Sequence, residues 1–127
     1  VGSEMCIRDR PEAFPQAERV ILGDYRDIGA KVRLQPEDYV VIMTPGHQAD
    51  YEVLEQALRF PTAYVGCIGS RHKVAATRAR LLEAGLTDAD ADRIHSPIGL
   101  DIGAETPEEI AVSIAAEMIA VRARHTA

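Results

Sequence analysis

The sequence predicts an α/β fold in which a parallel β-sheet carries helices on both faces. Short apolar runs rich in Val and Ile alternate along the chain with segments of helical periodicity, which is the pattern of repeated strand–helix–strand units. The run at residues 39–44 lacks polar alternation, as expected of a strand covered on both faces. The length of 127 residues, with 46% hydrophobic and 27% charged residues, is typical of one globular domain.

The first ten residues are expected to lie outside the native domain. Residues 5–9 read Met-Cys-Ile-Arg-Asp, the in-frame translation of an adapter used to build sequencing libraries. The segment has no apolar stretch after a basic start, so it is not a secretory signal peptide. We therefore expect an adapter-derived artefact over residues 1–10 and an incomplete domain, truncated at its start, over residues 11–127. A genuine flexible terminus is the alternative.

The expected strands follow the apolar runs of the chain. They lie at residues 19–23, 39–44 and 63–68, with a short extended edge segment at 94–100. Residues 24–37 are expected to hold a short helix or a loop. Helices are expected at residues 51–60, 71–84 and 107–121, with one further turn at 87–93.

Capping residues and apolar spacing support the first two helices. Asp50 is expected to cap the first helix, whose inner face carries Leu54 and Leu58. Gly85 is a suitable stop for the second helix. The buried side of that second helix is expected to consist of Val74, Ala75, Leu81 and Leu82.

The last helix carries the clearest start signal. Thr106 and Glu109 form a capping box, with Pro107 at the first helical position. Its few polar residues fall four apart, which predicts one narrow solvent-facing stripe on an otherwise buried helix. The stripe consists of Glu109, Ser113 and Glu117.

Composition and charge exclude several classes of function. The chain has 14 Lys and Arg against 20 Asp and Glu, a net charge of −6 and a pI near 5.1, which disfavours nucleic-acid binding. No apolar stretch is long enough to span a membrane. The two cysteines, Cys6 and Cys67, are too few for a disulfide scaffold, so the cytoplasm is the expected compartment. The histidine and cysteine spacings match no zinc pattern, and no metal site is expected.

The candidate chemistry lies at the carboxyl ends of two expected strands, in residues 44–50 and 66–73. Gly69 lets the backbone approach a ligand, and Ser70 can cap the next helix or donate to an oxyanion. Arg71 and Lys73 place positive charge in the first helical turn, where only a bound anion would favour it. This favours a phosphate site, and a plain strand–turn–helix corner with solvated basic residues is the alternative.

A third candidate is Asp101, which lies in a loop between Gly99 and Gly103. Its carboxylate could face a hydroxyl group of a ligand. The favoured interpretation is a turn in which Asp101 bonds its own backbone.

Two longer motifs give the chain a resemblance to a known family. Residues 64–71, Tyr-Val-Gly-Cys-Ile-Gly-Ser-Arg, and residues 94–111, from Ile-His-Ser-Pro to Glu-Glu-Ile-Ala, resemble the XdhC/CoxI family. The resemblance covers residues 11–122 and the family's C-terminal Rossmann-like domain, so a partial Rossmann-like sheet is implied. Thr44 to Asp50 resembles the family's Thr-Arg-Gly-His loop, with Pro45 in place of Arg. His72 stands where a second Arg is common.

The resemblance implies an accessory role in the maturation of molybdenum hydroxylases such as xanthine dehydrogenase. Such proteins bind molybdenum cofactor, help it receive its terminal sulfur, and hand it to the apoenzyme. The implied partners are an apo molybdenum hydroxylase and a cysteine desulfurase, and the implied role is that of a carrier more than an enzyme. Arg71 and Lys73 would hold the cofactor's phosphate, Gly66 and Gly69 would allow close approach, and His47 would contact the pterin.

Two other functions stay open from the sequence. An NAD(P)-binding oxidoreductase would need a glycine fingerprint and an acidic residue after the second strand. A purely structural interaction domain would use the last helix as its docking face. The missing first strand leaves an apolar edge near Tyr39 unpaired, so the chain is expected to be unstable or to self-associate.

Overall fold

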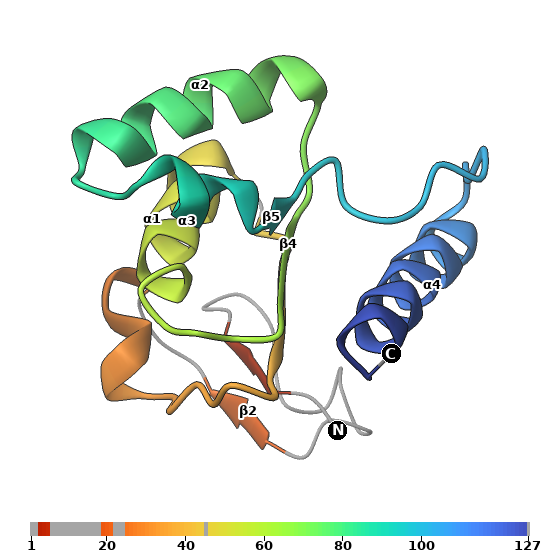
Figure 1. Cartoon of the computed structure of the whole chain (residues 1–127), viewed down its shortest axis with the longest axis horizontal. Coiled ribbons are helices and arrows are strands. Elements are labelled where there is room, and N and C mark those ends of the chain that lie inside the picture. The colour runs from red at the N-terminus through yellow and green to blue at the C-terminus, as the bar shows by residue number, and fades with distance from the viewer. Residues whose placement is uncertain (1–2, 6–18, 22–24, 45, 127) are drawn as a thin grey trace.

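A computed structural model describes residues 3–5, 19–21, 25–44 and 46–126 of the chain (Figure 1). The strands are β1 (Ser3–Met5), β2 (Arg19–Ile21), β3 (Tyr39–Ile42), β4 (Tyr64–Cys67) and β5 (Ile94–His95). The helices are the 3₁₀ helix η2 (Tyr25–Ala30) and the α-helices α1 (His47–Ala57), α2 (Arg71–Glu83), α3 (Asp88–Asp92) and α4 (Pro107–Thr126). None of these described helices is both long and apolar enough to cross a membrane.

The described strands form two sheets, and every pairing in them is parallel. β1 pairs with β2, and β4 lies between β3 and β5 in a three-stranded sheet. In that sheet Val65 lies opposite Val40 on one side and Ile94 on the other. This confirms the predicted α/β fold with a parallel sheet. The expectation for residues 1–10 stays a prediction, because Ser3–Met5 alone is described there.

Helices cover both faces of the three-stranded sheet, as predicted. Figure 1 shows α1, α2 and α3 on one side of β4 and β5, and α4 on the other. The core lies under α1 and α2, where apolar side chains of these helices meet the inward side chains of β3 and β4. Its buried members are Ile42, Leu54, Leu58, Val65, Cys67, Leu81 and Leu86.

Strand β3 is covered on one face only. Ile42 is buried against the helices, whereas Tyr39 and Val41 are 36% and 37% exposed on the opposite face. The expectation that this run is covered on both faces is therefore wrong. The reason is that α4 packs over β4 and β5, where Glu117 bonds Tyr64 and approaches His95. Strand β3 lies at the edge of the sheet, beyond this contact.

Helix α1 begins earlier than predicted. It starts at His47, and its N-cap residue is Gly46, whose extended backbone makes no side-chain cap. Asp50 is therefore not a cap, because it lies inside the first turn. Its carboxylate reaches back to Thr44 and ties the end of β3 to the helix. The predicted inner residues of this helix, Leu54 and Leu58, are buried as expected.

Helix α2 keeps its predicted ends but buries a narrower face. The Ser70 hydroxyl accepts a hydrogen bond from the Lys73 N–H at 3.4 Å, and Gly85 takes a φ of +95° just beyond the helix. Leu81 is fully buried, but Ala75 and Leu82 are exposed, which corrects the prediction for both. The helix is mostly solvated because α1 and α3 cover a single side of it.

Helix α4 starts at the predicted capping box, but the polar stripe predicted to face solvent faces the sheet. The side chains of Thr106 and Glu109 bond reciprocally to each other's backbone N–H groups. Ser113 and Glu117, expected to face solvent, are buried at 4% and 9% exposure. Large apolar residues of the same helix face outward instead, namely Val112 and Ile119.

Polar partners on the sheet explain this orientation of α4. The Tyr64 hydroxyl donates to Glu117 Oε1 at 2.6 Å, and the Gly99 N–H donates to the same oxygen at 3.2 Å. His95 Nδ1 lies 3.7 Å from it. A buried carboxylate with these donors is satisfied, so the polar stripe can face the sheet without penalty.

The remaining elements agree with the sequence. The expected turn at 87–93 is α3, with a capping box between Thr87 and Asp90. The expected edge segment at 94–100 is a strand only at its start, where β5 (Ile94–His95) pairs with β4. The strand expected at 19–23 is observed as β2, while residues 22 and 23 lie outside the described part.

Candidate functional site

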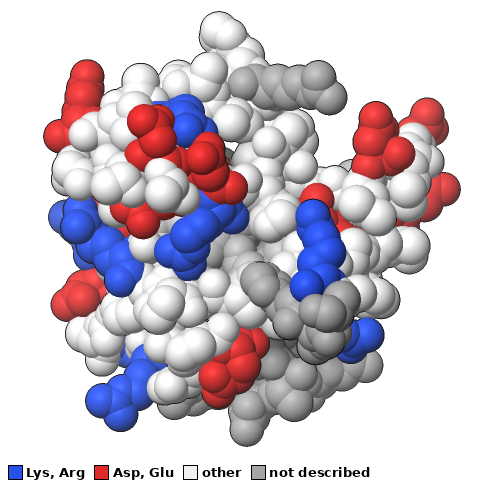
Figure 2. All heavy atoms as spheres, in the orientation of Figure 1, with Lys and Arg blue, Asp and Glu red and all other residues white. Residues whose placement is uncertain are grey.

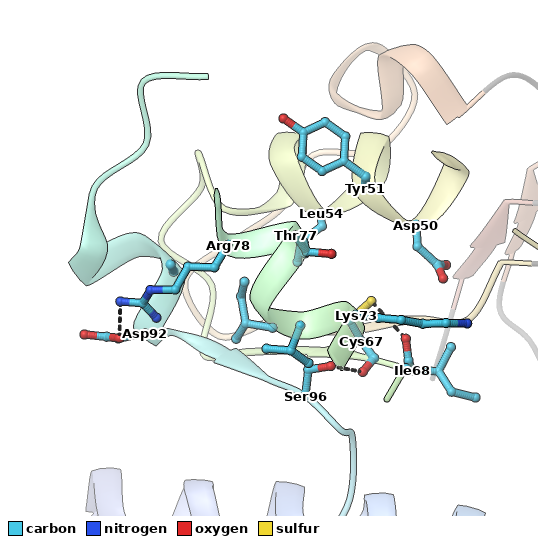
Figure 3. A pocket seen from close by; sticks show the side chains of 14 residues that line it. Asp50, Tyr51, Leu54, Cys67, Ile68, Lys73, Thr77, Arg78, Asp92 and Ser96 are labelled. Atoms are coloured by element: carbon cyan, nitrogen blue, oxygen red, sulfur yellow. Dashed lines mark hydrogen bonds and ion pairs between the residues drawn. The ribbon is translucent and has the colours of Figure 1, made fainter. Parts of the chain in front are cut away.

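A pocket of about 190 Å³ lies between α1, α2 and α3, above the carboxyl ends of β4 and β5. Its wall is apolar where Leu54, Val74 and Ile94 face it. Its polar side chains, shown in Figure 3, are those of Asp50, Lys73, Thr77, Arg78, Asp92 and Ser96. An apolar cavity with a few convergent polar groups at strand ends is the usual place for a ligand in an α/β fold.

The turn from β4 into α2 forms one wall of this pocket. Gly69 adopts a φ of +154°, which L-residues rarely adopt, and apart from its chain neighbours the nearest atom to where a side chain would begin is Ser96 Oγ, 4.0 Å away. Ser70 caps α2, so the first N–H groups of the helix lie beside Gly69. This arrangement offers backbone donors to an anion at close range.

Charge around the pocket is balanced. Figure 3 shows Arg78 and Asp92 at one end, and Asp50 and Lys73 at the other. Arg78 bonds Asp92 at 2.9 Å and Asp88 at 3.0 Å, and these hydrogen bonds raise its pKa. Among the lining cations that the structure describes, Lys73 makes no ion pair. Across the visible surface, acidic and basic side chains are also interspersed (Figure 2).

Asp50 ends the candidate segment 44–50, but the sequence analysis assigned it only a capping role and did not single it out as a site residue. Its side chain lines the pocket although the residue is only 8% exposed. Oδ1 accepts hydrogen bonds from the Thr44 N–H at 2.9 Å and from the Thr44 hydroxyl at 2.6 Å. The signal that could have found it is its place in the turn after β3, six residues beyond Thr44.

Cys67 contributes an inert thiol to the floor of the pocket. It is buried, and its Sγ lies 3.5 Å from the carbonyl oxygen of Ile68, to which it donates. Burial, and then the charge of Asp50, raise the pKa of Cys67 to about 12. A thiol with so high a pKa is protonated at neutral pH and is a poor nucleophile.

The structure brings some of the predicted site residues together. Gly69 and Lys73 line the pocket, and Ser70 lies between them at the start of α2. Arg71 is the first residue of α2 and His47 is the first residue of α1, so both begin helices that border the pocket. The side chains of Arg71 and His47 are outside what the structure describes.

Two predicted residues lie elsewhere. A side chain at Gly66 would meet Ile98 at 2.5 Å and the Tyr64 hydroxyl at 2.6 Å, on the α4 side of the sheet. Packing therefore explains this glycine, and its place in a cofactor site stays a prediction. Asp101 is exposed in the loop between β5 and α4, and it is not among the residues that line the pocket.

Known proteins resemble the chain over most of its length. It is 36% identical over 131 residues to the uncharacterised protein YqeB of Escherichia coli K12, covering 96% of this chain and 24% of YqeB. It is 34% identical over 111 residues to a probable xanthine dehydrogenase subunit of Bacillus subtilis 168, covering 87% of this chain and 32% of that protein.

A solved structure shares both fold and sequence with the chain. The crystal structure of a xanthine dehydrogenase from Bacillus halodurans superposes with a TM-score of 0.79 at 33% identity, over 96% of this chain and 35% of that one. The chain thus spans about a quarter to a third of the length of these relatives. The family model described as the XdhC Rossmann domain matches residues 3–118, so the chain belongs to this family of XdhC Rossmann domains.

Proposed function

We propose that the chain belongs to an accessory protein that binds molybdenum cofactor and delivers it during maturation of a molybdenum hydroxylase such as xanthine dehydrogenase. The observation that carries the proposal is the pocket at the carboxyl end of β4, in an XdhC Rossmann domain. Two relatives named for xanthine dehydrogenase support the choice of client enzyme.

The residues of the pocket suit the two chemical parts of this cofactor. A phosphate group would be held at the start of α2 by backbone N–H groups beside Gly69 and by Lys73. The pterin ring would lie against the apolar wall that Leu54 and Val74 provide. The pocket volume of about 190 Å³ is below the range of about 300–1,000 Å³ typical of complete ligand sites, so it would enclose part of the ligand.

A carrier role requires partners that supply and receive the cofactor. The cofactor supplies the redox chemistry of the hydroxylase, and this chain's residues would only bind and orient it. The proposed partners are the apo form of a molybdenum hydroxylase and a cysteine desulfurase that provides the terminal sulfur. The proposed compartment is the cytoplasm. NAD(P) binding is the competing function, and the binding experiment described next distinguishes the two.

The test is direct binding by the purified chain. Molybdenum cofactor released from a molybdenum enzyme is mixed with the chain without oxygen, and the mixture is passed through a desalting column. We expect molybdenum and pterin fluorescence to elute with the protein. Lys73→Ala should weaken binding about tenfold, because it removes a charge-assisted contact, while Lys73→Arg should retain most of the affinity.

A matched cation away from the pocket serves as the control. Arg59 pairs with Glu55 on α1 and does not line the pocket, so Arg59→Ala should leave binding unchanged. Equal losses in Lys73→Ala and Arg59→Ala would mean that overall charge, and not this site, attracts the cofactor. Retention of NADPH in place of the cofactor would favour the oxidoreductase function.

A further inference from the structure

We propose that Asp50 determines which ring the pocket accepts, by receiving a hydrogen bond from an exocyclic amino group of the bound ring. The identity of the ring as a pterin rests on the proposed function. The geometry that points to this role is a nearly buried carboxylate with one oxygen fixed and the other available to the pocket.

The two oxygens of Asp50 have different surroundings. Oδ1 accepts both hydrogen bonds from Thr44, at 2.9 Å and 2.6 Å, which orient the carboxylate. Oδ2 accepts no hydrogen bond from the described residues. No buried side-chain oxygen or nitrogen of the described residues lacks a partner, which indicates that Oδ2 is not fully enclosed by them. Because Asp50 is 8% exposed and lines the pocket, we place the open side of Oδ2 in the pocket.

The direction of the side chain agrees with this. Figure 3 shows the Asp50 carboxylate turned toward Cys67 and the end of Lys73. The charge of Asp50 also acts on Cys67, whose sulfur lies on the floor of the same pocket. The pocket therefore presents a preoriented acceptor with unused capacity, on the same side as the Lys73 cation.

This arrangement selects among ligands by their hydrogen-bond donors. A carboxylate repels an anion but strongly favours N–H donors in a pocket with little water. A ring with a carbonyl oxygen in place of the exocyclic amino group would turn an acceptor toward a desolvated Oδ2, which disfavours binding. A pterin and a lumazine both carry an N–H at N3, but only the pterin has an amino group at C2. Lumazine has a carbonyl group at C2 and so lacks the amino donor.

The experiment compares these two probes on the full chain. Pterin and lumazine are titrated against the chain by their own fluorescence. The wild type should bind pterin at least about tenfold more tightly than lumazine, the effect expected of one charge-assisted hydrogen bond. Asp50→Asn keeps the size of the side chain but turns an amide N–H₂ toward the ligand, so this preference should disappear.

A control variant separates orientation from recognition. Thr44→Val removes the hydroxyl that bonds Oδ1 but leaves the Thr44 backbone N–H and the second carboxylate oxygen in place. It should keep the preference for pterin. If circular dichroism shows that Asp50→Asn does not fold, Asp50→Glu replaces it. Glu keeps the charge but displaces the carboxylate by one methylene group, and the preference should again disappear.

The outcomes distinguish this inference from the proposed function. Equal affinity of the wild type for both probes, or an unchanged preference in Asp50→Asn, overturns the role of Asp50 even when molybdenum cofactor elutes with the protein. Failure of the cofactor to bind, together with a pterin preference that depends on Asp50, overturns the proposed function and leaves the recognition of the ring. Absence of binding by pterin, lumazine and cofactor overturns both.

Discussion

Cys67 shows how the surroundings of one residue decide its chemistry. The residue ends β4 and lies on the floor of the pocket, where a reactive thiol could in principle act on a ligand. Burial and the nearby charge of Asp50 instead raise its pKa from 9.0 to about 12. The side chain therefore acts as a neutral, polarisable wall against which a ring can pack.

We predict that the thiol of Cys67 is unreactive in the folded chain. Iodoacetamide at pH 8 should alkylate Cys67 slowly in the native state and rapidly in urea, because only the unfolded thiol ionises near pH 9. Between about pH 9 and pH 12 the unfolded state loses its proton first, so the free energy of unfolding should fall as the pH rises.

Mass spectrometry of peptides that contain Cys67 measures the first effect, and urea unfolding of Cys67→Ala beside the wild type measures the second. The alanine variant should lack this part of the pH dependence. Alkylation of native Cys67 at the unfolded rate would contradict the raised pKa.

At the scale of elements, the sequence locates the helices and the buried face of α1, but it predicts the wrong buried face for α4 and too wide a one for α2. The capping box at Thr106 and the stop at Gly85 are local signals, and both mark observed helix ends. The orientation of α4 depends instead on Tyr64, which is 53 residues before its partner Glu117. No local pattern contains that contact, so the spacing of polar residues alone predicts a solvent-facing stripe.

The candidate site also combines features set by local sequence with features set by distant contacts. The turn at Gly69 and Ser70 could be found because a glycine and a capping serine after an apolar run form a local pattern. The role of Asp50 depends on where α1 starts, and Gly46 starts it without a side-chain cap. Gly66 is the opposite case, because the space for its side chain is filled by Ile98 from a later loop.

The buried stripe of α4 leads to a prediction for that helix. Glu117→Ala should lower the free energy of unfolding by about 1–3 kcal/mol, because the Tyr64 hydroxyl and the Gly99 N–H lose their acceptor. Ile119→Ala, on the exposed face, should change it by less than about 0.5 kcal/mol. Urea denaturation of both variants measures the difference. The reverse order would mean that Ile119, and not Glu117, faces the sheet.

At the scale of the whole molecule, the parallel strands are divided between two sheets. β1 and β2 form one, while β3 is an outer strand of the other. No strand among the described residues pairs with the outer edge of β3, where Val41 lies in the middle of the strand and is 37% exposed. An apolar edge strand with unpaired backbone groups is a template for pairing with another strand.

We therefore predict that the chain self-associates through β3. Light scattering coupled to gel filtration should show a mass above that of one chain, increasing with concentration. Val41→Lys should shift the distribution toward the monomer, because a lysine at the edge must lose its hydration when two strands pair. Ile119→Lys places the same charge on the exposed face of α4 and should leave the mass distribution unchanged. A shift with Ile119→Lys alone would place the contact on α4, and a monomeric wild type at all concentrations would show that the edge of β3 is protected.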